Sequence, residues 1–126
     1  MKTINIITIL LLISFTSCVQ DIHQKTVTFR VDMNAVENVK NVGVRGNFTN
    51  PTWGRTIPLE DPDGDGIYEG TFSKKAAADN ISFKFVNQND QFELNGQDNR
   101  SIQFEYKPET ITYEAVFDKA EGKIIK

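Results

Sequence analysis

Several short segments of this chain alternate apolar and polar residues with a period of two, and that pattern constrains the fold more than any other feature. The clearest case runs from 27 to 33, where valine, phenylalanine, valine and methionine alternate with polar residues. The alternation returns at 81–86, 102–106 and 111–117. Successive side chains of a β-strand point to opposite faces, so each segment is typical of a strand with one buried face.

Shorter strand candidates lie at 42–44, 57–59, 68–72 and 92–94, and clusters of Gly, Asn, Asp and Pro separate them. The stretch 74–79 lacks helix caps and is interpreted as a loop or a single turn. Together the segments predict an all-β fold, an antiparallel β-sandwich of immunoglobulin-like architecture with about seven or eight strands. The side chains predicted to face inward are Phe29, Val31, Val44, Phe72, Phe83, Phe85, Phe104, Tyr113 and Phe117.

The N-terminal segment is interpreted separately from this domain. Residues 4–15 are mostly apolar, a stretch shorter than the ~20 residues that span a bilayer, which indicates a signal peptide over 1–17. Small residues precede the single cysteine, Cys18, as at a bacterial lipoprotein processing site, although Phe15 stands where leucine is usual. Residues 18–24 would then form a lipidated tether to a domain at 25–126, facing out of the cytoplasm in the cell envelope. The alternative is an incidental thiol; one cysteine allows no intramolecular disulfide.

Composition argues against two classes of function. The chain of 126 residues has a formal net charge of −3, and its longest basic run is Lys74–Lys75, so nucleic acid is not a predicted partner. The one histidine, His23, lies in the predicted tether, which leaves no Cys-His or Ser-His pair for nucleophilic catalysis. We expect neither an enzyme nor a bound cofactor.

Three segments contain candidate binding residues. Trp53, the only tryptophan, follows Pro51 and precedes Gly54, so a turn presents its indole, whose flat apolar face suits stacking on a sugar ring. The alternative is that Trp53 caps the core. Lys84 alternates with inward-facing residues and therefore points outward, where its ammonium has three donors for sugar hydroxyls. The alternative for Lys84 is an ordinary solvated lysine.

The third segment, FELNGQDNR, runs from Phe92 to Arg100. Phe92 either stacks on a ligand or belongs to the core together with Leu94. Arg100 is interpreted as organising the turn through backbone carbonyls.

The order of the turn with Trp53, the Phe-Lys-Phe at 83–85, Phe92-Glu93 and Asn99-Arg100 resembles the starch-binding domains of carbohydrate-binding module family 20. The resemblance covers about the middle half of the chain. It implies an α-glucan ligand such as starch or glycogen, with stacking by Trp53 and Phe92 and contact by Lys84. Glu93 and Asn99 match positions that bind sugar hydroxyls or support the loop. The family has tryptophan where this chain has Phe92, which offers a smaller face and no indole N–H.

A separate motif, DPDGDG, starts at Asp61 and spaces Asp61, Asp63 and Asp65 as in a calcium loop. Its twelfth position is Phe72, so the closing carboxylate is missing, and a β-turn between two strands is favoured. We therefore expect no metal to be required for folding.

The leading hypothesis is a non-catalytic carbohydrate-binding module that is held at a membrane only by its lipid. The alternative is a degenerate starch-binding-like domain that acts as a protein-interaction or accessory module of an envelope complex. A calcium-dependent adhesion module that uses the three aspartates comes third.

Overall fold

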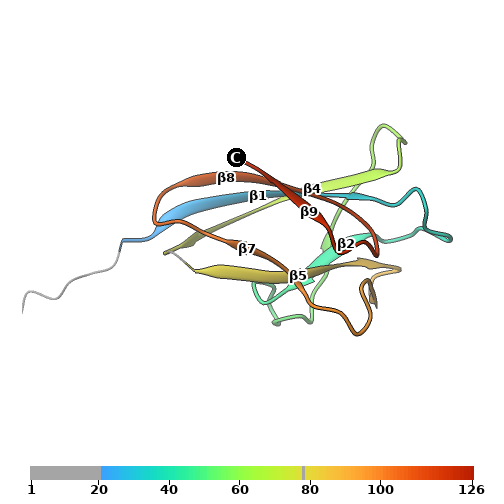
Figure 1. Cartoon of the computed structure of the whole chain (residues 1–126), viewed down its shortest axis with the longest axis horizontal. Coiled ribbons are helices and arrows are strands. Elements are labelled where there is room, and N and C mark those ends of the chain that lie inside the picture. The colour runs from blue at the N-terminus through green and yellow to red at the C-terminus, as the bar shows by residue number, and fades with distance from the viewer. Residues whose placement is uncertain (1–20, 78) are drawn as a thin grey trace, which may run out of the picture.

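The computed structural model describes residues 21–77 and 79–126 (Figure 1). The predicted signal peptide and Cys18 lie outside the described residues. The described residues form strands and loops, and none of them forms a helix long and apolar enough to cross a membrane. The strands are β1 His23–Asp32, β2 Gly43–Gly46, β3 Ile57–Pro58, β4 Ile67–Ala76, β5 Asn80–Asn87, β6 Gln91–Phe92, β7 Arg100–Gln103, β8 Glu109–Val116 and β9 Gly122–Ile125.

The strands form two sheets that lie one above the other in Figure 1. The first sheet has four strands in the order β4-β1-β8-β9. The second has five, in the order β3-β2-β5-β6, with β7 also paired to β5. The predicted all-β sandwich is confirmed. Among the pairings between named strands, only β1 with β8 is parallel, which places the first strand beside a late one.

The core lies between the two sheets and is built from the alternating apolar residues. Strand β1 buries every second residue, and its Phe29 ring lies 4.9 Å from the ring of Phe83 on β5 in an edge-on contact. Of the nine side chains predicted to face inward, eight are buried, and Phe72 is half-buried against the same cluster. The core therefore follows directly from the period-two pattern.

Three differences from the predicted elements concern β1, β4 and β9. Strand β1 begins at His23, so the last two residues of the predicted tether belong to the domain. Strand β4 continues to Ala76, into the stretch that was interpreted as a loop. Strand β9 was not predicted, because all four of its residues are exposed and they show no alternation.

Candidate functional site

The loop that carries Trp53 follows β2 and is fixed by backbone hydrogen bonds. The Trp53 N–H donates to the Gly46 carbonyl at 2.9 Å, and the buried Thr49 hydroxyl donates to the same carbonyl at 2.8 Å. Trp53 has a φ of +60°, a left-handed conformation that a bulky residue rarely adopts. Such strained residues persist only where the surroundings hold them, and they concentrate at binding sites. The fold therefore holds the backbone of Trp53 in one conformation.

Trp53 and Phe92 lie side by side, and we call these two rings the aromatic platform. Their centroids are 6.4 Å apart and their planes differ by 48°, and both side chains are half-buried. Phe92 pairs with Val86 of β5, which is fully buried although it lies outside the core cluster between the sheets. The platform therefore lies on the outer face of the second sheet, above an apolar base.

Arg45 was not among the residues predicted from the sequence, and it contacts both residues of the aromatic platform. Its Nε donates to the Thr56 hydroxyl at 2.7 Å, and its guanidinium carbon lies 5.7 Å from the Phe92 ring centroid. Its Nη1 donates to the Trp53 carbonyl at 3.4 Å. One guanidinium thus contacts the Phe92 ring and the backbone of Trp53. The signal in the sequence was its place next to Val44, because alternation along β2 turns Arg45 outward.

Lys84 lies on the outer face of β5, directly opposite Arg45. Its ammonium donates to the carbonyls of Leu94 at 2.8 Å and Gln97 at 3.1 Å. Two of its three donors therefore hold the loop that follows β6, which leaves one donor for a ligand.

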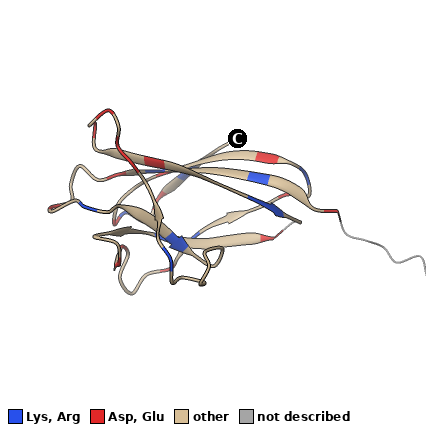
Figure 2. Cartoon of the chain, turned by 180° about the vertical axis from the view of Figure 1, so that it is seen from behind, with Lys and Arg blue, Asp and Glu red and all other residues tan. Residues whose placement is uncertain are grey.

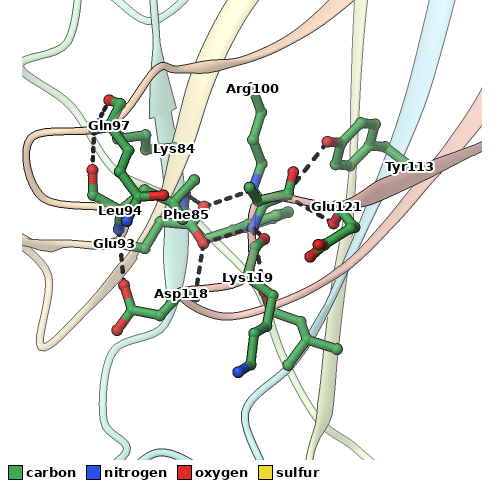
Figure 3. A network of polar contacts seen from close by, with 12 residues as sticks. Lys84, Phe85, Glu93, Leu94, Gln97, Arg100, Tyr113, Asp118, Lys119 and Glu121 are labelled. Atoms are coloured by element: carbon green, nitrogen blue, oxygen red, sulfur yellow. Dashed lines mark hydrogen bonds and ion pairs between the residues drawn. The ribbon is translucent and has the colours of Figure 1, made fainter.

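The carboxylate of Glu93 is not open to a sugar, and its surroundings fit the other role expected from the sequence, which is support of the loop. Its side chain is fully buried and forms an ion pair with Arg100, whose side chain is also buried (Figure 3). Arg100 Nε lies 2.7 Å from one carboxylate oxygen and Nη2 lies 2.8 Å from the other. Glu93 also accepts the N–H groups of Phe85 at 2.8 Å and Asp118 at 3.1 Å. Both of its carboxylate oxygens accept from protein donors and the side chain is fully buried, so its role is structural.

Arg100 organises turns through backbone carbonyls, as the sequence analysis expected. It donates to the carbonyls of Val116 and Glu121, both at 3.2 Å, and to that of Lys119 (Figure 3). Burial works against its charge, but the hydrogen bond with Glu93 raises the pKa of the guanidinium above its ordinary value. The ion pair joins β5, the segment after β6 and the turn between β8 and β9.

Asn99 is exposed and lies apart from the aromatic pair. It lines a shallow hollow together with Leu94, Gln97 and Arg100, and neither platform ring lines that hollow. Its contact with a sugar therefore stays a prediction.

The loop between β3 and β4 contains the three aspartates and appears as a red segment in Figure 2. Oxygens of Asp61, Asp63 and Asp65 lie within 4.8 Å of one another. Asp61 accepts the N–H groups of Gly64 at 3.0 Å and Gly66 at 2.9 Å. Burial opposes its ionisation, yet the bond from Gly66 and the others hold the pKa of Asp61 below its ordinary value. The side chain of Asp61 thus accepts hydrogen bonds from backbone N–H groups of its own loop, which stabilises the turn. Calcium binding there stays untested.

Comparisons with known proteins concern the fold. No protein-family model matches the sequence, and no curated protein matches it. Solved structures that are similar include the CBM25-2 and CBM25-1 modules of the beta/alpha-amylase from Paenibacillus polymyxa, both determined in solution. CBM25-2 is 18% identical with a TM-score of 0.45, over 82% of this chain and 93% of that one. CBM25-1 is also 18% identical, with a TM-score of 0.46, over 82% of this chain and 92% of that one.

Proposed function

We propose that this domain is a non-catalytic carbohydrate-binding module that holds a polysaccharide on the aromatic platform. The observation that supports this function is the pair of adjacent, half-buried rings of Trp53 and Phe92, tilted by 48° on the outer face of a sheet. Two neighbouring sugar rings present their apolar faces at an angle, and tilted aromatic rings match such a pair. The Lys84 ammonium and the Arg45 guanidinium lie on the same face and offer donors to hydroxyls at the ring edges.

The ligand that we propose first is an α-glucan such as starch or glycogen, which the order of the sequence motifs implies. A platform on an open surface desolvates few groups of the ligand. We therefore expect a dissociation constant of roughly micromolar to millimolar. Phe92 offers a smaller stacking face than tryptophan, which places the expected affinity toward the weak end of that range.

Replacing Trp53 by alanine should weaken the binding of maltoheptaose by about thirtyfold or more, as truncation of a central aromatic contact does. The loss of stability should stay below the ~3–5 kcal/mol of a fully buried tryptophan, because Trp53 is only half-buried. Phe92→Trp should tighten binding by enlarging the stacking face. Calorimetric titration measures both affinities, and thermal unfolding verifies that each variant is folded.

Tyr106→Ala is the matched control for these variants. Tyr106 is 48% exposed and contacts His23 rather than the platform, so its loss should leave the affinity unchanged. Normal maltoheptaose binding by a folded Trp53→Ala variant would refute the platform as the site. Binding of a protein partner that survives this substitution would favour the interaction-module alternative.

We further propose that a lipid on Cys18 displays the domain at the cell envelope. The support is the sequence around Cys18 and the short link between Cys18 and β1. That link, residues 18–22, can span at most about 18 Å when fully extended. Lys25 of β1 lies over the ring of Phe104, which follows β7 and is hydrogen-bonded beside the start of β5. The platform lies near the other end of β5, about 20 Å along that strand. An anchored domain would thus present its platform away from the lipid.

Cys18→Ser should move the protein from the membrane fraction to the soluble fraction, or block its processing. One acyl chain binds a membrane only marginally, so a stable anchor needs more than one. Mass spectrometry of the purified protein measures the added lipid directly. Unchanged membrane fractionation of the Cys18→Ser variant would exclude this anchor.

A further inference from the structure

Two cations face each other on the outer face of the second sheet. Arg45 of β2 and Lys84 of β5 are direct partners in the antiparallel register, and both are half-buried. Among the described residues, no ion pair includes either of them. Like charges directly opposite each other on neighbouring strands destabilise a sheet. The pair therefore calls for an explanation other than stability.

Arg30 on the first sheet is a useful contrast. It also faces outward from a central strand, but its register partners on β4 and β8 are Glu69 and Glu114. Both form ion pairs with it, at 3.3 Å and 3.0 Å. Thus Arg30, on the outer face of the first sheet, lies between two carboxylates. Arg45, on the outer face of the second sheet, lies opposite a second cation.

The neighbours of Arg45 and Lys84 position the two cations without neutralising them. Arg45 donates to a hydroxyl and a carbonyl, and Lys84 donates to two carbonyls. All four acceptors are uncharged. A guanidinium has five N–H donors and an ammonium three, so both groups keep donors for a ligand. The positive charge of the pair is thus held in place beside the aromatic platform, where the Arg45 guanidinium lies over the Phe92 ring.

We propose that Arg45 and Lys84 form an anion subsite, so that the preferred saccharide carries an acidic group next to the ring stacked on the platform. This inference rests on the proposed carbohydrate function and narrows its ligand class. The acidic group is the carboxylate of a uronic acid or an ester of phosphate or sulfate, since a guanidinium fork and an ammonium bind each of these anions. The whole chain has a net charge of −3, so general attraction of polyanions does not produce this preference.

The test compares ligands of matched length on the full chain by calorimetric titration. The ligands are maltohexaose, a phosphorylated maltohexaose and hexagalacturonate, each at low and at moderate salt. We expect an acidic ligand to bind about tenfold tighter than maltohexaose at low salt, the factor that one charge-assisted hydrogen bond supplies. Added salt should weaken the binding of the acidic ligand and leave that of maltohexaose unchanged. The two acidic ligands distinguish a carboxylate from a phosphate ester.

Variants separate the subsite from general electrostatics. Arg45→Gln and Lys84→Gln should each bring the affinity ratio of acidic to neutral ligand close to one. Arg45→Lys keeps the charge and should retain part of the ratio. Arg55→Gln is the matched control, because Arg55 is an exposed cation on the loop that carries Trp53 and does not belong to the Arg45–Lys84 pair. This substitution should leave the affinity ratio unchanged. Salt dependence of the unaltered protein gives an independent readout if Arg45→Gln fails to fold.

The outcomes keep this inference distinct from the proposed function. Equal affinity for all ligands, insensitive to salt, would overturn the anion subsite and leave the carbohydrate platform intact. An equal loss of the ratio in Arg55→Gln would also overturn it. The absence of binding to every saccharide would contradict the proposed function itself.

Discussion

Replacing Glu93 by alanine should lower the free energy of unfolding by about 3–5 kcal/mol, the cost of removing one partner of a buried ion pair. The reason is the state in which the substitution leaves Arg100. The side chain of Arg100 is 1% exposed, and in the variant its charge would stay buried without a carboxylate. Two backbone N–H groups, those of Phe85 and Asp118, would also lose their acceptor. Small domains are stable by only about 5–15 kcal/mol, so the variant should be close to unfolding.

The measurement is chemical denaturation of the full chain, followed by tryptophan fluorescence. The matched control is Glu114→Ala, which removes the carboxylate of a half-exposed ion pair with Arg30. Such pairs contribute about 0–1 kcal/mol, so the control should unfold close to the unaltered protein. Similar losses in the free energy of unfolding for the two variants would show that the Glu93–Arg100 pair contributes no more to stability than a surface ion pair.

A double variant tests whether the two residues act as one unit. Arg100→Met alone leaves Glu93 buried without its cation, and Glu93→Ala alone leaves Arg100 without its anion. In the double variant neither charge remains, so the combined loss should be smaller than the sum of the single losses by about 0.5–3 kcal/mol. Strict additivity would mean that the pair does not interact energetically.

The fold follows from the sequence because the core residues alternate. Val27, Phe29 and Val31 share one face of β1, and every one of them is buried. Alternation along each strand does not determine which strand lies beside it, so the parallel pairing of β1 with β8 was not predictable. Strand β9 gave no signal, because Ile124 and Ile125 are 44% and 40% exposed on opposite faces.

The site was only partly predictable from sequence. Motif order singled out Trp53 and Phe92 as candidates, and the structure places their rings side by side. Alternation predicted that Lys84 points outward. The buried ion pair of Glu93 was not predicted, because charged residues are rarely fully buried and its partner Arg100 lies on a separate strand, β7. Leu94 has a φ of +52°, so the alternation that would pair it with Phe92 ends there. A role for Arg45 could be inferred only from the sheet register, which places it opposite Lys84.

The second large effect concerns Lys25, which lies in phase with the apolar residues of β1 and points inward. Its side chain is fully buried, and its ammonium lies 3.1 Å from the carboxylate of Glu109, which is 3% exposed. It also donates to the carbonyl of Glu105 at 2.5 Å and to that of Lys107. Lys25→Met keeps most of the apolar stem and removes the charge, which leaves Glu109 and two carbonyls without this donor. We expect a loss of about 3–5 kcal/mol at neutral pH.

The size of this loss should depend on pH. Burial opposes the ionisation of Glu109, but the hydrogen bond from Lys25 and further bonds hold the pKa of Glu109 below its ordinary value of 4.5. A lowered pKa means that the ionised carboxylate stabilises the folded protein above the unfolded pKa. That contribution is lost as the pH falls through the folded pKa. In Lys25→Met the only ammonium that still opposes the effect of burial is that of Lys126, 3.3 Å from the other carboxylate oxygen. The pKa of Glu109 should therefore rise, and protonation should relieve the buried charge.

The difference in stability between the two proteins should therefore be largest near pH 7. It should shrink as the pH falls through the raised pKa of Glu109 in the variant, and shrink further below about pH 4.5 as Glu109 of the unaltered protein is protonated. Urea denaturation at a series of pH values measures it. Lys107→Met is the matched control, since Lys107 pairs with Glu105 at the surface, with side chains 60% and 56% exposed. That control should differ little from the unaltered protein at any pH. A Lys25→Met deficit that stays constant from pH 7 to pH 3 would place its origin in lost packing rather than in the buried charge of Glu109.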